Sequence, residues 1–438
     1  MNLIIGFIGI VALVLLMLMR MPLGVAMAFV SFVGVTTMMG MRSALGIFTS
    51  GPFEFVASWS LSSIPMFMFM GYICYYAGLT DSLFMVAKRL LHRLAGGLGI
   101  AAIGGAAAFS AVCGSSLATA AAMGRIAVPE MVRNGYNPAF AGALVAVGGT
   151  LGNLIPPGIF FILYGIFTEV SIGKLFIAGI LPGILSAVVF SVTIWLRVKA
   201  DPSLVNHQLS EVERQALPPV SSEGRLIDAL PITLLFFGIM GGLFTGLFSA
   251  AEAGAAGAFL SLLIALPRRN FTRSRFKRSV VESLEMTAST FLIGIASIMF
   301  TQFMALSGVP DYLSQIVVGA TTNPIVFVVG VSVIYFVLGC FIEPIGIMLL
   351  TLPFMMPILK QLDIDMIWMG VLIVKYLELG MITPPVGMNL FVIKAMMPHT
   401  SLAAMFRQVN WFILADLVTT AFLIIFPSIS TWLPSIIK

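Results

Sequence analysis

Long apolar runs recur along the whole chain, and they limit more than any other feature how this sequence can fold. Of 438 residues, 59% are hydrophobic and 9% are charged, whereas about a quarter of the residues in a soluble globular domain are charged. Many of the runs approach the roughly 20 residues that an α-helix needs to cross a bilayer. A transmembrane β-barrel would instead show short segments of alternating polarity. We therefore expect an all-α polytopic membrane protein.

The apolar runs are of two kinds. Two of them, 98–134 and 324–360, are too long for one crossing and are interrupted near their middles by Gly, Ser or Pro. We expect both to form re-entrant hairpins, because non-helical backbone at membrane depth is tolerated where it is buried in protein or lines a cavity. The other runs are expected to be full crossings, at 3–19, 22–41, 59–78, 138–168, 175–196, 228–247, 249–266, 286–307, 366–397 and 409–427.

The basic residues predict which side of the membrane each loop faces. With both termini outside, 17 of the 23 lysines and arginines fall on the cytoplasmic side, as the positive-inside rule requires. This asymmetry accounts for the basic composition without nucleic acid. The cytoplasmic set is Arg20, Lys88, Arg89, Arg93, Arg133, Arg197, Lys199, Arg214, Arg225, Arg268, Arg269, Arg273, Arg275, Lys277, Arg278, Lys394 and Arg407.

Short motifs in the first half of the chain recur in the second half, in the same order and at nearly the same spacing. In the expected topology the first hairpin enters from the inside and the second from the outside, so the two copies are inverted. Transporters built from inverted repeats place their substrate and ion sites near the midplane, at broken helices. A duplicated structural bundle is the alternative. The matching segments are 77–83 with 307–313, 128–131 with 352–355, and 151–157 with 379–385.

Two proline pairs, Pro156-Pro157 and Pro384-Pro385, each interrupt an apolar helix. Proline removes a backbone donor and clashes with the preceding turn, so carbonyl oxygens are freed next to each pair. Oxygen-only sites of this kind suit a hard cation such as sodium. Simple kinks in packed helices are the alternative. The carbonyls expected to be free lie near Gly152, Ile155, Gly380 and Thr383.

The hairpin tips carry polar residues at membrane depth. Gly114 permits a turn, and Ser115 and Ser116 offer hydroxyl groups. The helix that follows this tip offers free amides with positive dipole character, which favour an anionic substrate. Glu343, followed by Pro344, occupies the second tip, and an ionisable group at this depth is a functional candidate by default.

Other intramembrane charges have structural alternatives. Arg125 lies at a depth where it could meet a substrate carboxylate, but it could also pair with Glu130 or extend to the inner membrane face. Lys375 and Glu378 are three residues apart on one helix and are expected to pair with each other. Glu252 and Asp416 are each expected to hold a structural hydrogen bond, with a position facing a cavity as the alternative for Asp416.

Several of these segments together resemble the large membrane subunit of TRAP transporters (tripartite ATP-independent periplasmic transporters). They are 114–119, 128–136, Glu252 with the following Ala, 341–344 and 383–391. The resemblance spans nearly the whole chain. It implies a sodium-driven elevator importer of an organic acid, such as a sialic acid or a C4-dicarboxylate, in a bacterial inner membrane. It also implies two partners, a soluble periplasmic substrate-binding protein and a small membrane subunit of about four helices, with Na⁺ as the coupling ion and no cofactor.

The same resemblance implies where the ligands bind. The substrate is expected near Ser115, Ser116 and Glu343, with Arg125 as a further candidate. Glu343 stands where family members often carry Asp. One sodium site is expected around Ser116, Gly152, Asn153 and Ile155, and a second around Gly380, Thr383 and Val386.

The elevator reading divides the chain into a moving core and a scaffold. Residues 98–168 and 324–397 are the expected core. Residues 1–97 are expected to hold scaffold helices and a first connecting arm at 79–93. Residues 169–323 would hold further scaffold helices, a polar loop at about 200–225 and a second arm at 309–320, and residues 398–438 a last scaffold helix.

Three other functions are alternatives for a sequence of this kind. A stand-alone sodium/anion symporter of related fold would need no binding protein, and a channel would show non-saturating flux. An intramembrane enzyme is disfavoured because paired aspartates, a Ser/His pair at depth and a metal cluster are lacking in the sequence. The lack of a Walker A pattern argues against direct coupling to ATP. A proton is the alternative coupling ion.

Overall fold

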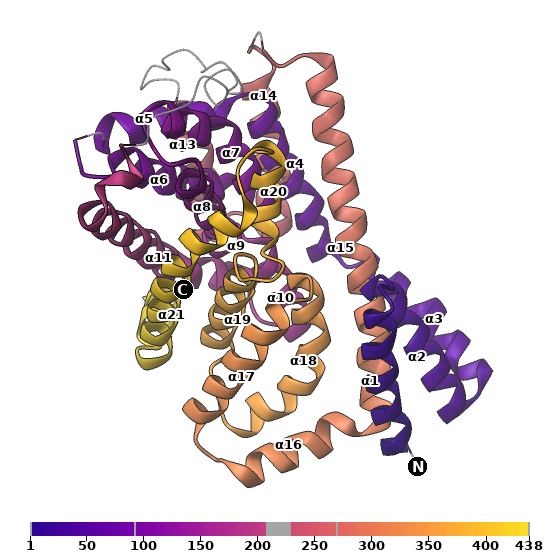
Figure 1. Ribbon diagram of the computed structural model, residues 1–438. Coiled ribbons are helices and arrows are strands. Elements are labelled where there is room, and N and C mark those ends of the chain that lie inside the picture. The colour runs from indigo at the N-terminus through magenta and orange to yellow at the C-terminus, as the bar shows by residue number, and fades with distance from the viewer. Residues whose placement is uncertain (1, 92, 207–228, 269, 437–438) are drawn as a thin grey trace.

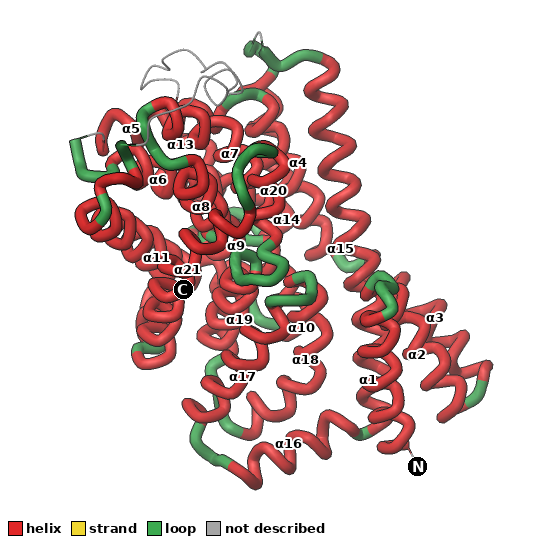
Figure 2. The backbone as a smooth tube through the Cα atoms, in the orientation of Figure 1, coloured by secondary structure: helices red, strands yellow, loops and turns green. Residues whose placement is uncertain are grey.

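The computed structural model describes residues 2–91, 93–206, 229–268 and 270–436. Throughout these ranges the regular structure is helical, and Figure 2 shows the helices joined by short loops. Most of the polar loop expected at about 200–225 lies outside the described residues. Its first part follows helix α11 (Ile172–Ala200) as a short 3₁₀ turn, η2 (Pro202–Leu204).

One side of the molecule is formed by α1 (Asn2–Leu18), α2 (Leu23–Met39), α3 (Met41–Val56) and the long helix α15 (Arg273–Ser307) (Figure 1). Two glycines let these helices approach closely. A Cβ atom on Gly9 would lie 2.5 Å from the Phe303 ring, and one on Gly34 would lie 2.2 Å from it. Phe303 is fully buried in the cluster that joins α1, α2 and α15.

Helix α3 corrects the sequence prediction, which left residues 42–58 outside the expected crossings. Gly46, Gly51, Pro52 and neighbouring hydroxyl residues weaken the apolar signal of this segment. The helix nevertheless forms because the hydroxyl groups are satisfied within it. Thr49 Oγ1 donates to the Leu45 carbonyl oxygen at 2.9 Å, and Ser50 Oγ donates to the Gly46 carbonyl oxygen at 3.1 Å.

The next helices extend this side toward the centre. A 3₁₀ turn, η1 (Trp59–Ser62), leads into α4 (Ser63–Tyr76). Helix α14 (Ala250–Ala265) packs against α4, and α13 (Leu230–Phe244) packs against α14. The two expected arms are α5 (Leu79–Leu91) and α16 (Val309–Ala320). Each arm follows a glycine in the left-handed region, Gly78 with φ 69° and Gly308 with φ 72°, a conformation that glycine adopts without a steric penalty.

Both long apolar runs are split into two helices where Gly, Ser and Pro interrupt them. The first run forms α6 (Gly97–Cys113) and α7 (Ser116–Arg133), and the second forms α17 (Pro324–Gly339) and α18 (Pro344–Gln361). The tips therefore lie at 114–115 and 340–343, as the sequence predicted. Their re-entrant placement and inverted relation stay predictions.

Each hairpin is followed by a broken helix. The first consists of α8 (Pro138–Gly149), α9 (Leu151–Leu154) and α10 (Ile159–Thr168), and the second of α19 (Met366–Gly380) and α20 (Met388–Met396). Both proline pairs lie in the non-helical gaps, and the bond within each pair is cis. The expected breaks are thus present in both helices.

Helix α11 and helix α21 (Leu402–Ile425), followed by α22 (Ser428–Ile436), cover the side of the molecule opposite α1–α3 (Figure 1). Phe190 and Phe412 on these helices are fully buried, in one cluster with Leu144 of α8 and Leu390 of α20. The two largest differences in helix starts are at α15, which begins at Arg273 and not at 286, and at α21, which begins at Leu402 and not at 409. Thr272 caps α15 by accepting a hydrogen bond from the Arg275 amide, so the basic segment continues the helix.

Five helical segments in the described residues are long and apolar enough to cross a membrane, and the pair α3 with η1–α4, bent by 55°, adds a sixth. This makes the chain a polytopic membrane protein. The other expected crossings form helices shorter than 18 residues or interrupted ones, so the count of ten stays a prediction. The five segments are Pro138–Thr168, Ile172–Ala200, Arg273–Ser307, Pro344–Gln361 and Leu402–Ile425.

Candidate functional site

The tip of the first hairpin is held against the first broken helix by backbone contact. Gly114 has φ 63°, and a Cβ atom there would lie 2.1 Å from the Pro157 carbonyl oxygen. The Ile159 amide donates to the Gly114 carbonyl oxygen at 3.2 Å. On the other side of the tip, a Cβ atom on Gly152 would lie 2.5 Å from the Ser116 backbone nitrogen. Only glycine permits these approaches without displacement of the backbone.

This contact positions a buried cluster of three polar side chains from three different helices. Ser116 Oγ of α7 lies 2.5 Å and 2.7 Å from the two carboxylate oxygens of Glu378 on α19, to which it donates. Asn153 Nδ2 of α9 donates to Ser116 Oγ at 2.9 Å. Ser116 is 1% exposed, Asn153 3% and Glu378 1%. Hydroxyl, amide and carboxylate oxygens are the ligands that hard cations prefer.

The second broken helix meets the second hairpin through a glycine pair. A Cβ atom on Gly380 would lie 2.8 Å from the Gly339 Cα atom. The Gly380 carbonyl oxygen accepts a hydrogen bond from the Thr383 amide at 3.2 Å, and Thr383 Oγ1 donates to the Leu379 carbonyl oxygen at 2.7 Å. These oxygens are therefore engaged locally, although a carbonyl oxygen keeps a second lone pair for a ligand. Val386 lies in the same non-helical gap.

A cavity of about 50 Å³ lies between the two hairpin tips, and Ser115, Ser116, Asn153 and Glu343 all line it. Ser115 Oγ also caps α7 through a hydrogen bond from the Ala118 amide at 3.5 Å. The rest of the lining is mostly apolar, with Met68, Phe160 and Met286 among its residues.

The structure thus brings three of the four substrate candidates to one cavity. The fourth, Arg125, lines a different cavity. The remaining sodium candidates Gly152, Ile155, Gly380, Thr383 and Val386 are absent from the lining of the 50 Å³ cavity.

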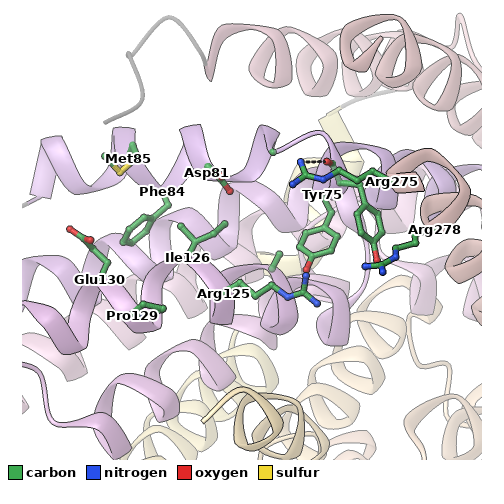
Figure 3. A pocket seen from close by; sticks show the side chains of 13 residues that line it. Tyr75, Asp81, Phe84, Met85, Arg125, Ile126, Pro129, Glu130, Arg275 and Arg278 are labelled. Atoms are coloured by element: carbon green, nitrogen blue, oxygen red, sulfur yellow. Dashed lines mark hydrogen bonds between the residues drawn. The ribbon is translucent and has the colours of Figure 1, made fainter. Parts of the chain in front are cut away.

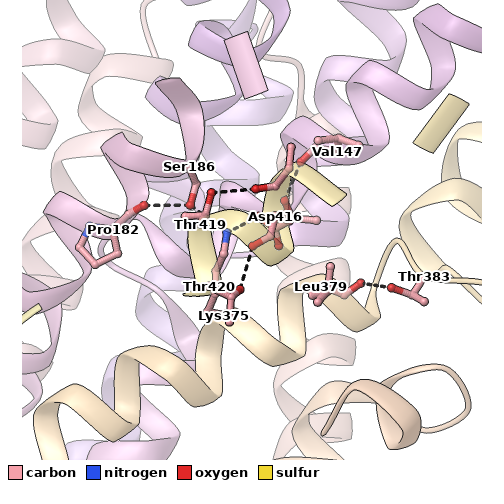
Figure 4. Close-up of polar contacts among 11 residues, drawn as sticks. Val147, Pro182, Ser186, Lys375, Leu379, Thr383, Asp416, Thr419 and Thr420 are labelled. Carbon is pink, nitrogen blue, oxygen red and sulfur yellow. Dashed lines mark hydrogen bonds and ion pairs between the residues drawn. The ribbon is translucent and has the colours of Figure 1, made fainter. Parts of the chain in front are cut away.

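The expected pairing of Lys375 with Glu378 is wrong. Lys375 Nζ forms an ion pair with Asp416 of α21 and donates to Ser186 Oγ of α11 at 2.8 Å (Figure 4). Residues three apart differ by about 60° around a helix, so Lys375 points to α11 and α21 while Glu378 points to the hairpin tip. Asp416 is the structural partner that the sequence predicted.

Two other charges also have partners. Pairing of Arg125 with Glu130, one alternative from the sequence, is replaced by an ion pair between Lys88 and Glu130. Glu252 accepts a hydrogen bond from the Ser249 amide at 2.8 Å and completes a capping box at the start of α14. That contact is the structural role expected of Glu252.

Sequence reasoning missed Glu378 as a member of the site. Its spacing from Lys375 suggested an ion pair within one helix. An ionisable residue in an apolar span is a functional candidate by default, and this rule, applied to Glu378, would have found it. Only the fold shows that Glu378 of the second broken helix reaches the tip of the first hairpin.

A helical membrane chain with broken helices around an enclosed polar cluster has the form of a transport protein. Residues 10–429 match the family described as "Tripartite ATP-independent periplasmic transporter, DctM component". The chain belongs to this family, whose named members are permeases and not enzymes. It is a TRAP transporter large permease.

Relatives of this chain carry different substrate names. The chain is 34% identical over 387 residues to the C4-dicarboxylate TRAP transporter large permease protein DctM of Pseudomonas aeruginosa, covering 88% of this chain and 86% of that one. It is 28% identical to the sialic acid TRAP transporter large permease protein SiaM of Vibrio cholerae, covering 95% of each. It is 31% identical to the isethionate TRAP transporter permease protein DctMQ of Oleidesulfovibrio alaskensis, covering 78% of this chain and 53% of that protein.

Among solved structures, the Alcanivorax borkumensis YdaH transporter has a similar fold. The TM-score is 0.63 at 14% identity, with 89% of each chain covered. A likeness at this identity concerns the fold alone, and it agrees with the all-helical polytopic fold described above.

Proposed function

We propose that this chain is the permease of a sodium-coupled TRAP system that imports a small organic acid by an elevator mechanism. The observation that carries the proposal is the buried cluster of Ser116, Asn153 and Glu378, held where a hairpin tip meets both broken helices. A carboxylate removed from water needs compensation by a cation or by hydrogen bonds. A sodium ion at this cluster would supply positive charge next to an anionic substrate.

We assign two sodium sites to the residues that the resemblance to the family implies. The first site would consist of Ser116, Asn153 and the carbonyl oxygens of Gly152 and Ile155. Glu378 joins this site because it accepts a hydrogen bond from Ser116. The second is at Gly380, Thr383 and Val386, next to the glycine contact with the second hairpin. Sodium at both sites would fix the two hairpin tips relative to the broken helices.

The substrate would bind between the tips, at Ser115, Ser116 and Glu343. C4-dicarboxylates, sialic acid and isethionate, which appear in the names of relatives, are all organic anions. The positive end of α7 and its capping serine suit a carboxylate. The cavity of about 50 Å³ is far below the roughly 300–1,000 Å³ of ordinary small-molecule pockets, so the tips must separate to admit an acid.

In the elevator mechanism, residues 98–168 and 324–397 would move against the scaffold, with α5 and α16 as arms. The packing supports counting α11 and α21 with the moving part, because the ion pair of Lys375 with Asp416 and the Lys375–Ser186 hydrogen bond tie both to α19. The proposed setting is a bacterial inner membrane with both termini periplasmic. The proposed partners are a small four-helix membrane subunit and a periplasmic substrate-binding protein.

Reconstitution tests this function. The chain is placed in liposomes with its small subunit, and binding proteins loaded with labelled succinate or sialic acid are added. We expect uptake of one acid that requires an inward sodium gradient. Uptake that ignores sodium would contradict the ion assignment, and uptake without a binding protein would favour a stand-alone symporter.

A further inference from the structure

A second cavity, of about 320 Å³, lies among α4, α5, α7 and α15. Its lining includes Arg125, Arg275 and Arg278 together with the acids Asp81 and Glu130. Figure 3 shows the three arginines around Tyr75 at one end of the cavity, while Glu130 lies at the other end. Its volume is within the range of roughly 300–1,000 Å³ for small-molecule pockets, unlike that of the cavity between the hairpin tips.

The acids near this cavity are largely engaged by other groups. Lys88 forms an ion pair with Glu130, and the Tyr76 hydroxyl donates to Glu282. Asp81 is the remaining acid of the lining. Within the described part of the chain, none of the three guanidinium groups forms an ion pair with a carboxylate. The cavity therefore carries excess positive charge.

Arg125 and Arg275 are held by contacts that use few of their N–H donors. The Arg125 guanidinium lies 5.4 Å from the centre of the Tyr75 ring, an arrangement that orients the cation without consuming its N–H groups. Arg275 donates to the Tyr76 carbonyl oxygen at 3.4 Å. The Tyr75 hydroxyl is buried and has no hydrogen-bond partner among the residues that the structure describes. Arginine N–H groups arranged in a fork match the two oxygens of a carboxylate.

Helices α4, α7 and α15 line both this cavity and the cavity between the hairpin tips. Helix α4 contributes Met68 to the cavity between the tips and Tyr75 to the basic one, and α15 contributes Met286 and Arg278 in the same way. Helix α7 contributes Ser116 to the first cavity and Arg125 to the second. At 1.5 Å per helical residue, these separations correspond to roughly 10–15 Å along the helices. An anion leaving the hairpin tips along these faces would next meet the three arginines.

We propose that the cavity of Arg125, Arg275 and Arg278 is a second anion site, where the carboxylate of the transported acid binds between the hairpin site and release into the cytoplasm. This inference rests on the proposed function. In it, the substrate contacts Arg125 at a later step of transport than Ser115 and Glu343. The cavity lies on the side of the membrane that the positive-inside rule assigns to the cytoplasm.

Basic pockets between membrane helices also bind the phosphates of anionic lipids, which share the chemistry of an oxygen anion. The common helix faces favour the transported acid, because a lipid site would need no connection to the hairpin cavity. The experiment must separate these two sources.

The test compares Arg125→Gln with Arg125→Lys and with Arg273→Gln, a control on α15 outside the cavity lining. Each complex is reconstituted with its small subunit and binding protein in liposomes with and without anionic phospholipid. Uptake of labelled succinate or sialic acid is measured, whichever the unmodified complex transports. Sodium-dependent binding of that acid is measured separately on the purified complex.

For Arg125→Gln we expect the maximal uptake rate to fall roughly tenfold, the order associated with loss of one charge-assisted hydrogen bond, in both lipid mixtures. The affinity of the hairpin site should stay unchanged, Arg125→Lys should recover most of the rate, and Arg273→Gln should behave as the unmodified chain. An unchanged rate for Arg125→Gln, or an effect confined to anionic lipid, would overturn the proposal. Failure of the proposed function is distinguishable, because the unmodified complex would then show no sodium-driven uptake.

Discussion

The two hairpin and broken-helix units differ sharply in how they are covered. In the first, the broken helix from Pro138 to Thr168 is almost entirely buried, and α11, α21 and α7 surround it. In the second, α17 exposes a row of large apolar side chains that includes Val326, Val333 and Val337, and Glu343 at the tip is exposed. Helix α19 is the exception within the second unit, since all residues from Trp368 to Gly380 are buried.

The difference in burial indicates which parts of the site are held in position by the fold alone. Backbone contacts at Gly114 and Gly152 and the burial of Ser116 leave the first tip one position. The second tip is held to α19 chiefly through the Gly339–Gly380 contact, so its position depends more on what occupies the cavity. We expect disruption of α19 to affect the whole chain, and disruption of the second tip to affect transport alone.

The largest effect is expected from Asp416→Ala, which removes the partner of Lys375. A buried charge left unpaired costs about 3–5 kcal/mol, and Lys375 is 2% exposed. Thermal unfolding in detergent should show a marked loss of stability. The double variant Lys375→Met with Asp416→Leu should recover most of it, because apolar replacement of a buried pair is often neutral. A double variant as unstable as the single one would show that the pair is not the cause.

A smaller effect is expected from Glu378→Gln, which keeps the shape of the side chain and removes its charge. Loss of a hydrogen bond to a charged group costs about 1.5–3 kcal/mol, here between Ser116 and Glu378. The apparent sodium affinity for uptake should fall roughly tenfold or more, since a carboxylate ligand is lost. Ser116→Ala should shift the sodium dependence in the same direction. Unchanged sodium dependence in both variants would remove the cluster from the ion site.

The glycine contact of the second unit offers a matched pair on one helix. A Cβ atom on Gly339 would lie 3.0 Å from the Gly380 Cα atom, whereas one on Gly330 would meet nothing within 4 Å. Overpacking costs about 1–3 kcal/mol, so Gly339→Ala should displace the second tip and slow uptake. Gly330→Ala should leave uptake unchanged. Equal rates for the two variants would argue that the contact does not position the tip.

Much of this architecture could be predicted from the sequence because apolar runs, interrupting residues and proline pairs are local signals. Both hairpin tips and both helix breaks lie where those signals place them. Helix α3 could not be predicted, since its hydroxyl and glycine residues resemble a loop until the helix satisfies their hydrogen bonds.

The partners of Glu378 and Lys375 were also beyond the sequence. Their spacing on one helix favours a mutual pair, but Ser116 lies 262 residues and Asp416 41 residues away along the chain. Only the packing of α19 against α7, α9 and α21 decides which contacts form. Local patterns therefore predict where helices stop, whereas the chemistry of the site depends on contacts between distant helices.

The smallest effect is expected from Ser115→Ala, and it separates structural from ligand-binding roles at the first tip. Loss of an N-cap costs about 0.5–2 kcal/mol, and the bond from Ala118 to Ser115 Oγ is long at 3.5 Å, so the loss of stability should be at the low end. If Ser115 contacts the substrate, the affinity for the acid should nevertheless fall while the sodium dependence of uptake stays unchanged. Ser116→Ala should change both, because Ser116 bonds Asn153 and Glu378. Binding isotherms of the labelled acid at several sodium concentrations would distinguish the two serines, and identical isotherms for both variants would mean that the tip acts as one unit.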